Sequence, residues 1–141
     1  MQLIKASRLL VVAIMMTFLL AGTIPHPANA QAVMCQGKVA TIVGGSGNDV
    51  LTGTPNDDVI HGLEGADIIE GNGGNDTICG GDGNDEIYGN GGDDSLNGGK
   101  GNDVLRGGNG KDVLDCGQGD DKYNGGGGND SVQPNCETFV F

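Results

Sequence analysis

The chain has few basic residues. Lysine and arginine together number seven against nineteen acidic residues, which gives a formal net charge of −12 at neutral pH. This balance argues against nucleic acid and against an anionic membrane as partners, because both carry charge of the same sign as the protein. We therefore expect neither partner for this chain.

Long apolar runs are also scarce, since the sequence holds a single one at residues 9–21. A membrane-spanning helix needs about 20 apolar residues, so this run is too short to span comfortably. Lys5 and Arg8 precede it, and the small-x-small sequence of residues 28–30 follows it, which is the pattern of a signal peptide covering residues 1–30. No later segment is apolar enough to anchor the chain. We expect a secreted, extracellular, soluble protein beginning at Gln31.

Recognisable catalytic arrangements are missing as well. The sequence contains no HExxH, no GxSxG and no Cys/His cluster, and its glycine-rich segments carry Asp and do not end in Lys-Ser or Lys-Thr as a phosphate-binding loop does. His61 is the one histidine after residue 30, and its position in the repeat described next points its side chain to solvent. We expect no enzymatic activity. The alternative of a hydrolase predicts turnover that is lost when His61 or a specific Asp is replaced.

The chain does contain a repeat of nine residues, present in ten consecutive units at residues 44–133 without insertion or deletion. Of the 29 glycines, 27 fall in the first four places of these units. The sixth place is always Asp: Asp49, Asp58, Asp67, Asp76, Asp85, Asp94, Asp103, Asp112, Asp121 and Asp130. The eighth place is always apolar: Leu51, Ile60, Ile69, Ile78, Ile87, Leu96, Leu105, Leu114, Tyr123 and Val132. Each unit is predicted to form a six-residue turn with one carboxylate, followed by a three-residue strand with one inward side chain.

This pattern resembles the calcium-binding nonapeptide GGxGxDxUx of the repeats-in-toxin (RTX) family, and the unit at residues 80–88, GGDGNDEIY, matches it best. The resemblance implies an all-β fold, a parallel β-roll or β-solenoid of about five coils, each built from two units. It also implies that Ca²⁺ lies between stacked turns, held by the sixth-place Asp carboxylates and by peptide carbonyls from the first four places. Calcium prefers such oxygen ligands and takes about six to eight of them.

Stacking of each unit on the unit eighteen residues later is part of the same resemblance. All ten sixth-place aspartates then become calcium ligands, and four gaps in each of two rows allow at most eight ions. Six aspartates have a stacked neighbour on both sides and are expected to serve two ions: Asp67, Asp76, Asp85, Asp94, Asp103 and Asp112. Four lie on end coils and are expected to serve one: Asp49, Asp58, Asp121 and Asp130.

Several units depart from the pattern. Asn56 replaces the fourth-place glycine of the second unit, and Cys116 replaces the first-place glycine of the ninth. Ala66 stands where a polar fifth residue is usual, and Lys122 and Tyr123 weaken the ninth strand. We expect the second and ninth units to form the weakest sites.

Folding is expected to require calcium. Cleavage after residue 30 removes two basic residues and leaves five against nineteen acidic ones, a formal charge of −14. One inward side chain per unit is a small core to set against the entropy of ordering the turns. Without metal the stacked carboxylates also repel one another, so we expect the roll to be unfolded in its metal-free state.

Four cysteines in a small secreted chain suggest two disulfides, and three pairings are possible. Cys116 and Cys136 lie 20 residues apart, close to one full coil, which places them within disulfide reach. The remaining pair, Cys35 and Cys79, requires the leading segment to fold back. Residues 39–43 are apolar enough to cover one open end of the roll, and residues 139–141 the other.

The chain is thus divided into a signal peptide at residues 1–30, an N-terminal cap at 31–43, the β-roll at 44–133 and a C-terminal cap at 134–141. Two uses of the roll stay open at this point. One is calcium binding coupled to folding outside the cell. The other is an extracellular adhesion or interaction module, whose regular faces bind a protein or glycan partner that the sequence does not identify.

Overall fold

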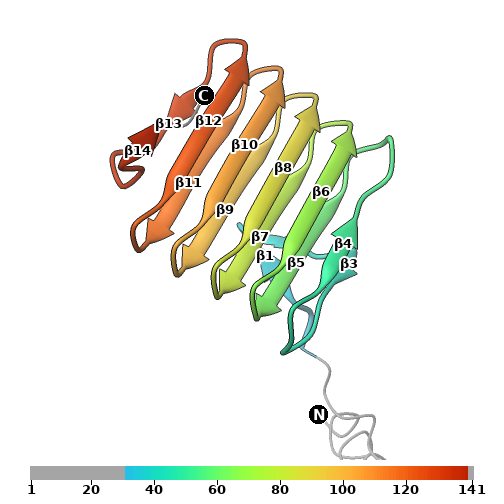
Figure 1. The fold of residues 1–141 in the computed structure, drawn as a ribbon. Helices are drawn as coiled ribbons and strands as arrows, with labels where there is room; N and C mark the ends of the chain where they lie inside the picture. The colour runs from blue at the N-terminus through green and yellow to red at the C-terminus, as the bar shows by residue number, and fades with distance from the viewer. Residues whose placement is uncertain (1–30, 140–141) are drawn as a thin grey trace, which may run out of the picture. The chain divides into compact units, whose positions relative to one another are not determined.

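The computed structural model describes residues 31–139, so the predicted signal peptide and residues 140–141 lie outside the described part (Figure 1). These residues form strands and turns, and no helix occurs among them. Consequently no helix in this part of the chain is long and apolar enough to cross a bilayer. The strands belong to one compact unit that begins at Ala32.

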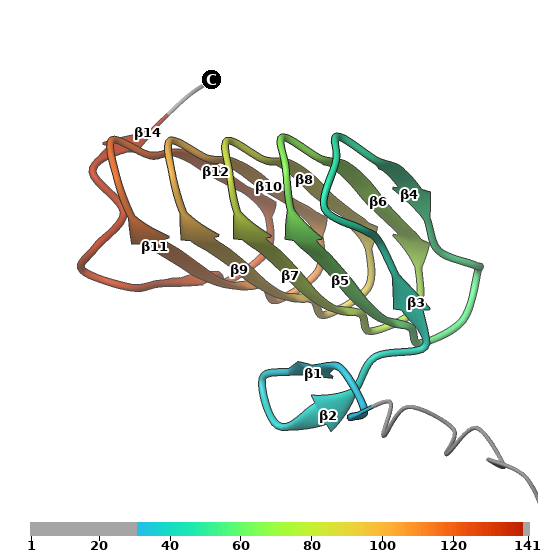
Figure 2. The same cartoon turned by 90° about the horizontal axis from the view of Figure 1, so that it is seen from below.

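Two six-stranded parallel sheets face each other and form the β-roll (Figures 1 and 2). The first sheet has the order β13-β11-β9-β7-β5-β3, and the second has the order β14-β12-β10-β8-β6-β4. The strands of the first sheet are β3 (Ile42–Val43), β5 (Val59–Glu64), β7 (Thr77–Asp82), β9 (Ser95–Lys100), β11 (Val113–Gln118) and β13 (Ser131–Val132). Those of the second are β4 (Val50–Thr52), β6 (Ile68–Gly73), β8 (Glu86–Gly91), β10 (Val104–Asn109), β12 (Lys122–Gly127) and β14 (Thr138–Phe139).

Every pairing between strands of the repeat units joins residues eighteen apart, as for Ile60 with Ile78 and Ile87 with Leu105. The terminal strand β14 lies beyond the repeats and pairs with β12 at a separation of sixteen, as for Lys122 with Thr138. The expected all-β roll of about five coils, each built from two nonapeptide units, is therefore confirmed. The eighth-place side chains point between the sheets, and those from Ile60 to Leu114 are fully buried. The core is less well covered at the two ends of the roll, where the eighth-place residues Leu51 and Tyr123 are only partly buried.

The expected division into six-residue turns and three-residue strands is wrong for the interior of the roll. Interior strands have six residues, covering places seven to nine of one unit and places one to three of the next. Pairing resumes after the first-place glycine, since Leu63 pairs with Gly81 and Glu64 with Asp82. The second place has a positive φ, for example +84° at Leu63, so the chain bends there without leaving the sheet. Only places four to six remain as the turn.

The leading segment folds back as a hairpin of β1 (Met34–Cys35) and β2 (Lys38–Val39). It lies against the outer face of the first sheet, because Lys38 donates to the hydroxyl of Thr77 and Ser95 donates to the side-chain carbonyl of Gln36. The expected cap over the open end of the roll is therefore wrong for this hairpin, which lies on the sheet face and leaves Val39 56% exposed. Within residues 39–43, Ile42 packs on the core. Figure 2 shows the hairpin outside the first sheet, on the side of β5 and β7.

Two disulfides fasten the ends of the described chain, with the pairing expected from the sequence. Cys35 in the hairpin bonds to Cys79 in β7, with their Cα atoms 5.7 Å apart. Cys116 in β11 bonds to Cys136 beyond β13, with their Cα atoms 5.1 Å apart. The C-terminal strand β14 then adds to the second sheet beside β12. Thus both terminal segments are tied to the roll covalently.

Candidate metal centre

The sixth-place aspartates form two rows, one along each edge of the roll where the turns lie. Within a row, the backbone N–H of each aspartate donates to Oδ1 of the aspartate eighteen residues later, as from Asp67 to Asp85 at 2.9 Å and from Asp85 to Asp103 at 2.8 Å. Eight such bonds join all ten predicted ligands into two continuous ladders. The stacking therefore brings the residues of each row together as expected.

The second carboxylate oxygen of the stacked aspartates has no hydrogen-bond partner. Seven Oδ2 atoms are buried in this way, on Asp67, Asp76, Asp85, Asp94, Asp103, Asp112 and Asp121. A buried carboxylate oxygen without a partner is costly, because it has lost its water and gained nothing in return. Each of these seven atoms is therefore a place where a proton or a cation would be stabilised.

First-place glycines bring a main-chain carbonyl close to the same oxygen. A Cβ placed on Gly62 would come within 3.0 Å of both Oδ2 of Asp67 and the carbonyl oxygen of Gly80. Glycine at this place thus allows a carboxylate and a carbonyl from neighbouring coils to converge. Cys116, in the last unit of its row, replaces such a glycine where no further repeat unit stacks on it, and its side chain forms a disulfide instead.

The charged state of these carboxylates is disfavoured. Burial raises the pKa of Asp85 to about 6, and it raises the pKa of Asp94 and of Asp103 to about 7. Burial also raises the pKa of Asp76 and of Asp112. In each case the hydrogen bond from the preceding aspartate opposes the shift, whereas the neighbouring carboxylates add to it. No positively charged side chain is among the groups that shift these pKa values, so nothing compensates the negative charge of the ionised rows.

Side chains alone do not complete a metal site. Among residues 31–139 there is no group of three or more His, Cys, Asp or Glu side chains close enough to hold an ion. Zinc sites need three or four such ligands. Calcium accepts main-chain carbonyls beside carboxylates, and the structure places both types of oxygen together at every first-place glycine except Gly125, on which no further repeat unit stacks. The residues present fit a hard, oxygen-bound cation.

The fifth place forms a second ladder that the sequence analysis missed. The side-chain oxygen of Asn84 accepts the backbone N–H of Asn102, and that of Asn102 accepts the N–H of Asp120. This ladder runs in the opposite direction to the aspartate ladder, since here the earlier residue is the acceptor. Asn and Asp recur at the fifth place, which is the feature of the sequence that indicates it. Ala66 offers no acceptor and interrupts the ladder.

His61 does not point freely to solvent as expected. It is half-buried, its Nδ1 accepts the backbone N–H of Leu63, and burial lowers its pKa below the ordinary value. The imidazole is therefore neutral near pH 7, with its proton on Nε2. It lies on the face of the first sheet and belongs to neither aspartate row.

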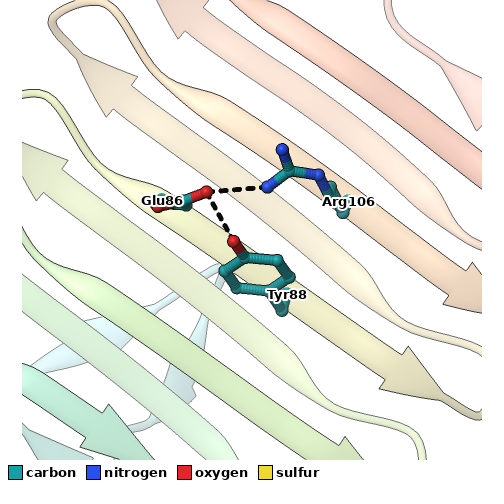
Figure 3. A network of polar contacts seen from close by, with 3 residues as sticks. All are labelled: Glu86, Tyr88 and Arg106. Carbon is teal, nitrogen blue, oxygen red and sulfur yellow. Dashed lines mark hydrogen bonds and ion pairs between the residues drawn. The ribbon is translucent and has the colours of Figure 1, made fainter. Parts of the chain in front are cut away.

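The outer face of the second sheet carries a small polar network, which Figure 3 shows. Glu86 accepts a hydrogen bond from the hydroxyl of Tyr88 and forms an ion pair with Arg106 at 2.8 Å. The guanidinium of Arg106 also lies over the Tyr88 ring, 5.0 Å from its centre. These side chains are balanced in charge, and the network fits a structural role.

Comparison with known proteins supports the reading of the repeats. A family model described as the RTX calcium-binding nonapeptide repeat, in four copies, matches in overlapping segments that together cover residues 43–132. Neither a curated protein nor a solved structure gave a match. The matched segments contain all ten sixth-place aspartates.

Proposed function

Since the chain belongs to the RTX calcium-binding nonapeptide repeat family, we propose that it is a secreted protein whose β-roll folds when Ca²⁺ binds between its stacked turns. The single observation that carries this proposal is the set of seven buried, unpartnered Oδ2 atoms. A divalent cation would supply the positive charge that is missing beside these buried carboxylate oxygens. Calcium is the cation that the family's repeats bind.

The ten sixth-place aspartates are the proposed carboxylate ligands, and the carbonyls of places one to four complete each site. The eight aspartate-to-aspartate hydrogen bonds define eight gaps between neighbouring coils, so up to eight ions are proposed. Because the ligands of each gap come from units eighteen residues apart, the site exists only when the coils are stacked. Binding and folding are therefore coupled.

Secretion is supported by the two disulfides and by the N-terminal pattern of residues 1–30. Disulfides persist in oxidising compartments and are rare in the cytosol. Extracellular calcium modules bind with midpoints of about 10⁻⁴–10⁻³ M, which suits a chain that folds after export. We also propose that the chain has no catalytic activity of its own, because its buried carboxylates are committed to the two ladders.

Circular dichroism of the purified chain from Gln31 tests the proposal. The chain is expected to be largely disordered in chelator and to gain β-structure cooperatively as Ca²⁺ is added. Magnesium serves as the matched control and is expected to substitute poorly, because it demands tighter octahedral geometry. A fully folded spectrum in excess chelator would contradict the proposal.

A further inference from the structure

The outer face of the first sheet contains a hollow of roughly 650 Å³ that belongs to neither aspartate row. It runs across four neighbouring coils at their second places, which are Gly45, Leu63, Gly81 and Gly99. Neighbouring strands lie about 4.8 Å apart, so the hollow is elongated along the stacking direction. It is shallow and open to solvent, as a site for an extended ligand is.

The floor of the hollow is bare main chain for a steric reason. Gly81 and Gly99 have φ of +124° and +110°, and a Cβ on either would meet the carbonyl of the preceding coil at less than 3.0 Å. On the opposite sheet, the equivalent places carry Asn72 and Asn90 in the middle of the stack, and Asn72 covers the main chain by donating to the carbonyl of Gly53. The hollow is therefore a property of one face.

Leu63 supplies the apolar part of the wall at a cost in backbone strain. It is the one leucine with a positive φ among residues 31–139, at +84°, in a place that Gly or Asn fills in most other units. Backbone strain of this kind concentrates at binding sites. The half-buried side chain of Leu63 thus lines the hollow from a backbone conformation that leucine rarely adopts.

The rim carries both donors and acceptors of hydrogen bonds. Asp82 and Lys100 form an exposed ion pair at 2.8 Å, and Glu64 and Ser46 lie along the same rim. His61 is held with Nδ1 occupied by the N–H of Leu63, so Nε2–H is a fixed donor. Hydroxyl groups act as donor and acceptor at once, so a ligand rich in hydroxyls matches such a mixed rim.

Other ligand classes fit less well. Two carboxylates on the rim disfavour anions, and no group of three metal-binding side chains exists among the described residues. An extended peptide needs a free strand edge, but β7 pairs with both β5 and β9, so the floor offers none. A neutral sugar chain needs neither an anion site nor a strand edge.

We propose that this hollow binds a short neutral oligosaccharide, with the bare floor and Leu63 against the sugar rings and Asp82, Glu64, Lys100 and His61 bonded to hydroxyls. The site rests on the proposed function, because the four coils that form it are adjacent only in the folded roll. Side chains of the site lie at places two, three and nine, away from the turns that carry the aspartate ladders.

Nuclear magnetic resonance tests the site with the calcium-saturated chain from Gln31. Amide signals are followed while neutral tetrasaccharides of glucose and of N-acetylglucosamine are added, and a tetrasaccharide of galacturonate serves as the anionic comparison. We expect shifts at Gly81, Gly99 and Lys100 with a neutral sugar. A spectrum that stays unfolded in saturating calcium overturns the proposed function and this site with it. A folded spectrum that no neutral sugar shifts, or that only galacturonate shifts, overturns this site alone.

Matched variants locate the binding. Asp82→Asn is expected to weaken sugar affinity about tenfold, the loss typical of one hydrogen bond to a charged group. Glu86→Gln disrupts an ion pair of the same 2.8 Å length on the opposite sheet and is expected to leave affinity unchanged. Leu63→Gly is expected to weaken binding while raising the thermal stability, a pair of opposite effects that a purely structural leucine does not give. Equal losses from Asp82→Asn and Glu86→Gln would overturn the site.

Discussion

The first two turns of the roll and its interior turns are built from the same nine-residue unit, but the sixth-place aspartate has different hydrogen bonds in the two regions. In the first unit, Oδ2 of Asp49 accepts the backbone N–H of Gly45 at 2.6 Å. In the second, Oδ2 of Asp58 accepts both the N–H and the hydroxyl of Thr54. In an interior turn such as that of Asp85, Oδ2 is buried and has no partner.

This difference arises from stacking. A unit with no repeat unit before it satisfies its carboxylate within its own loop. A unit with coils on both sides packs its carboxylate between them, and burial raises the pKa of Asp85 to about 6. In the first two units, Oδ2 therefore has a partner without a cation, because it is hydrogen-bonded within its own loop. In units that stack on a preceding coil, Oδ2 has no such partner and a cation would stabilise it.

The largest test of this comparison removes one aspartate from the interior and one from the end. Asp85→Ala deletes the acceptor of the Asp67 N–H and a carboxylate that borders two gaps, so we expect loss of two calcium sites and a large rise in the calcium needed for folding. Asp130→Ala borders one gap and is expected to lose one site and fray the end. Calorimetric stoichiometry and the dichroism midpoint measure both, and equal losses would show that stacking does not set the roles.

A second test breaks the close approach that stacking creates. Gly62→Ala places a methyl group against Asp67 Oδ2 and the Gly80 carbonyl, and such overpacking costs about 1–3 kcal/mol. Gly47→Ala is the matched control, because a Cβ there meets nothing within 4 Å. Thermal unfolding in saturating calcium compares them. If Gly47→Ala destabilised as much as Gly62→Ala, the requirement for glycine would be local to each loop.

Acidity provides a third test, in the absence of metal. The folded-state pKa values of Asp94 and Asp103 are about 7, above the ordinary 3.8, so protonation favours the folded state. Their stabilisation is fully present below about pH 4 and is lost as the pH rises through about 7. We expect the chelated chain to gain β-structure on acidification across this range. Asp103→Asn, which cannot ionise, is expected to make the dependence shallower, and an unchanged profile would contradict the assignment.

The smallest expected effect sharpens the comparison at the fifth place. Ala66→Asn is expected to supply the missing acceptor for the backbone N–H of Asn84 and to stabilise the roll by about 0.5–1.5 kcal/mol. Asn84→Ala is the reciprocal change, since it removes the bond to Asn102, and is expected to destabilise by a similar amount. Chemical denaturation in saturating calcium measures both. Two changes of the same sign would contradict the ladder.

Prediction from the sequence succeeded where the repeat and its resemblance to the RTX family decide the contact. Ile60 and Ile78 occupy the same place of units eighteen residues apart, so a roll with two units per coil and no insertions pairs them. It failed where the contact depends on what is stacked above or below. Places one to three of each unit were expected in the turn, whereas Leu63 and Glu64, at places two and three, pair within the sheet. His61 was expected to face solvent, whereas the bend at Leu63 brings an N–H to its ring.

The sequence determined the inward side chain and the turn carboxylate of every unit through its unbroken nine-residue period. Its resemblance to the RTX repeats added two units per coil, and with them the roll, its eighteen-residue stacking and the two rows of aspartates. Only the tertiary structure decided which carboxylate oxygens lack partners, where the leading hairpin lies and which face is hollow. Those features depend on close packing between coils and on which glycines leave the main chain bare, and no period within one unit encodes the atoms of the coil stacked against it.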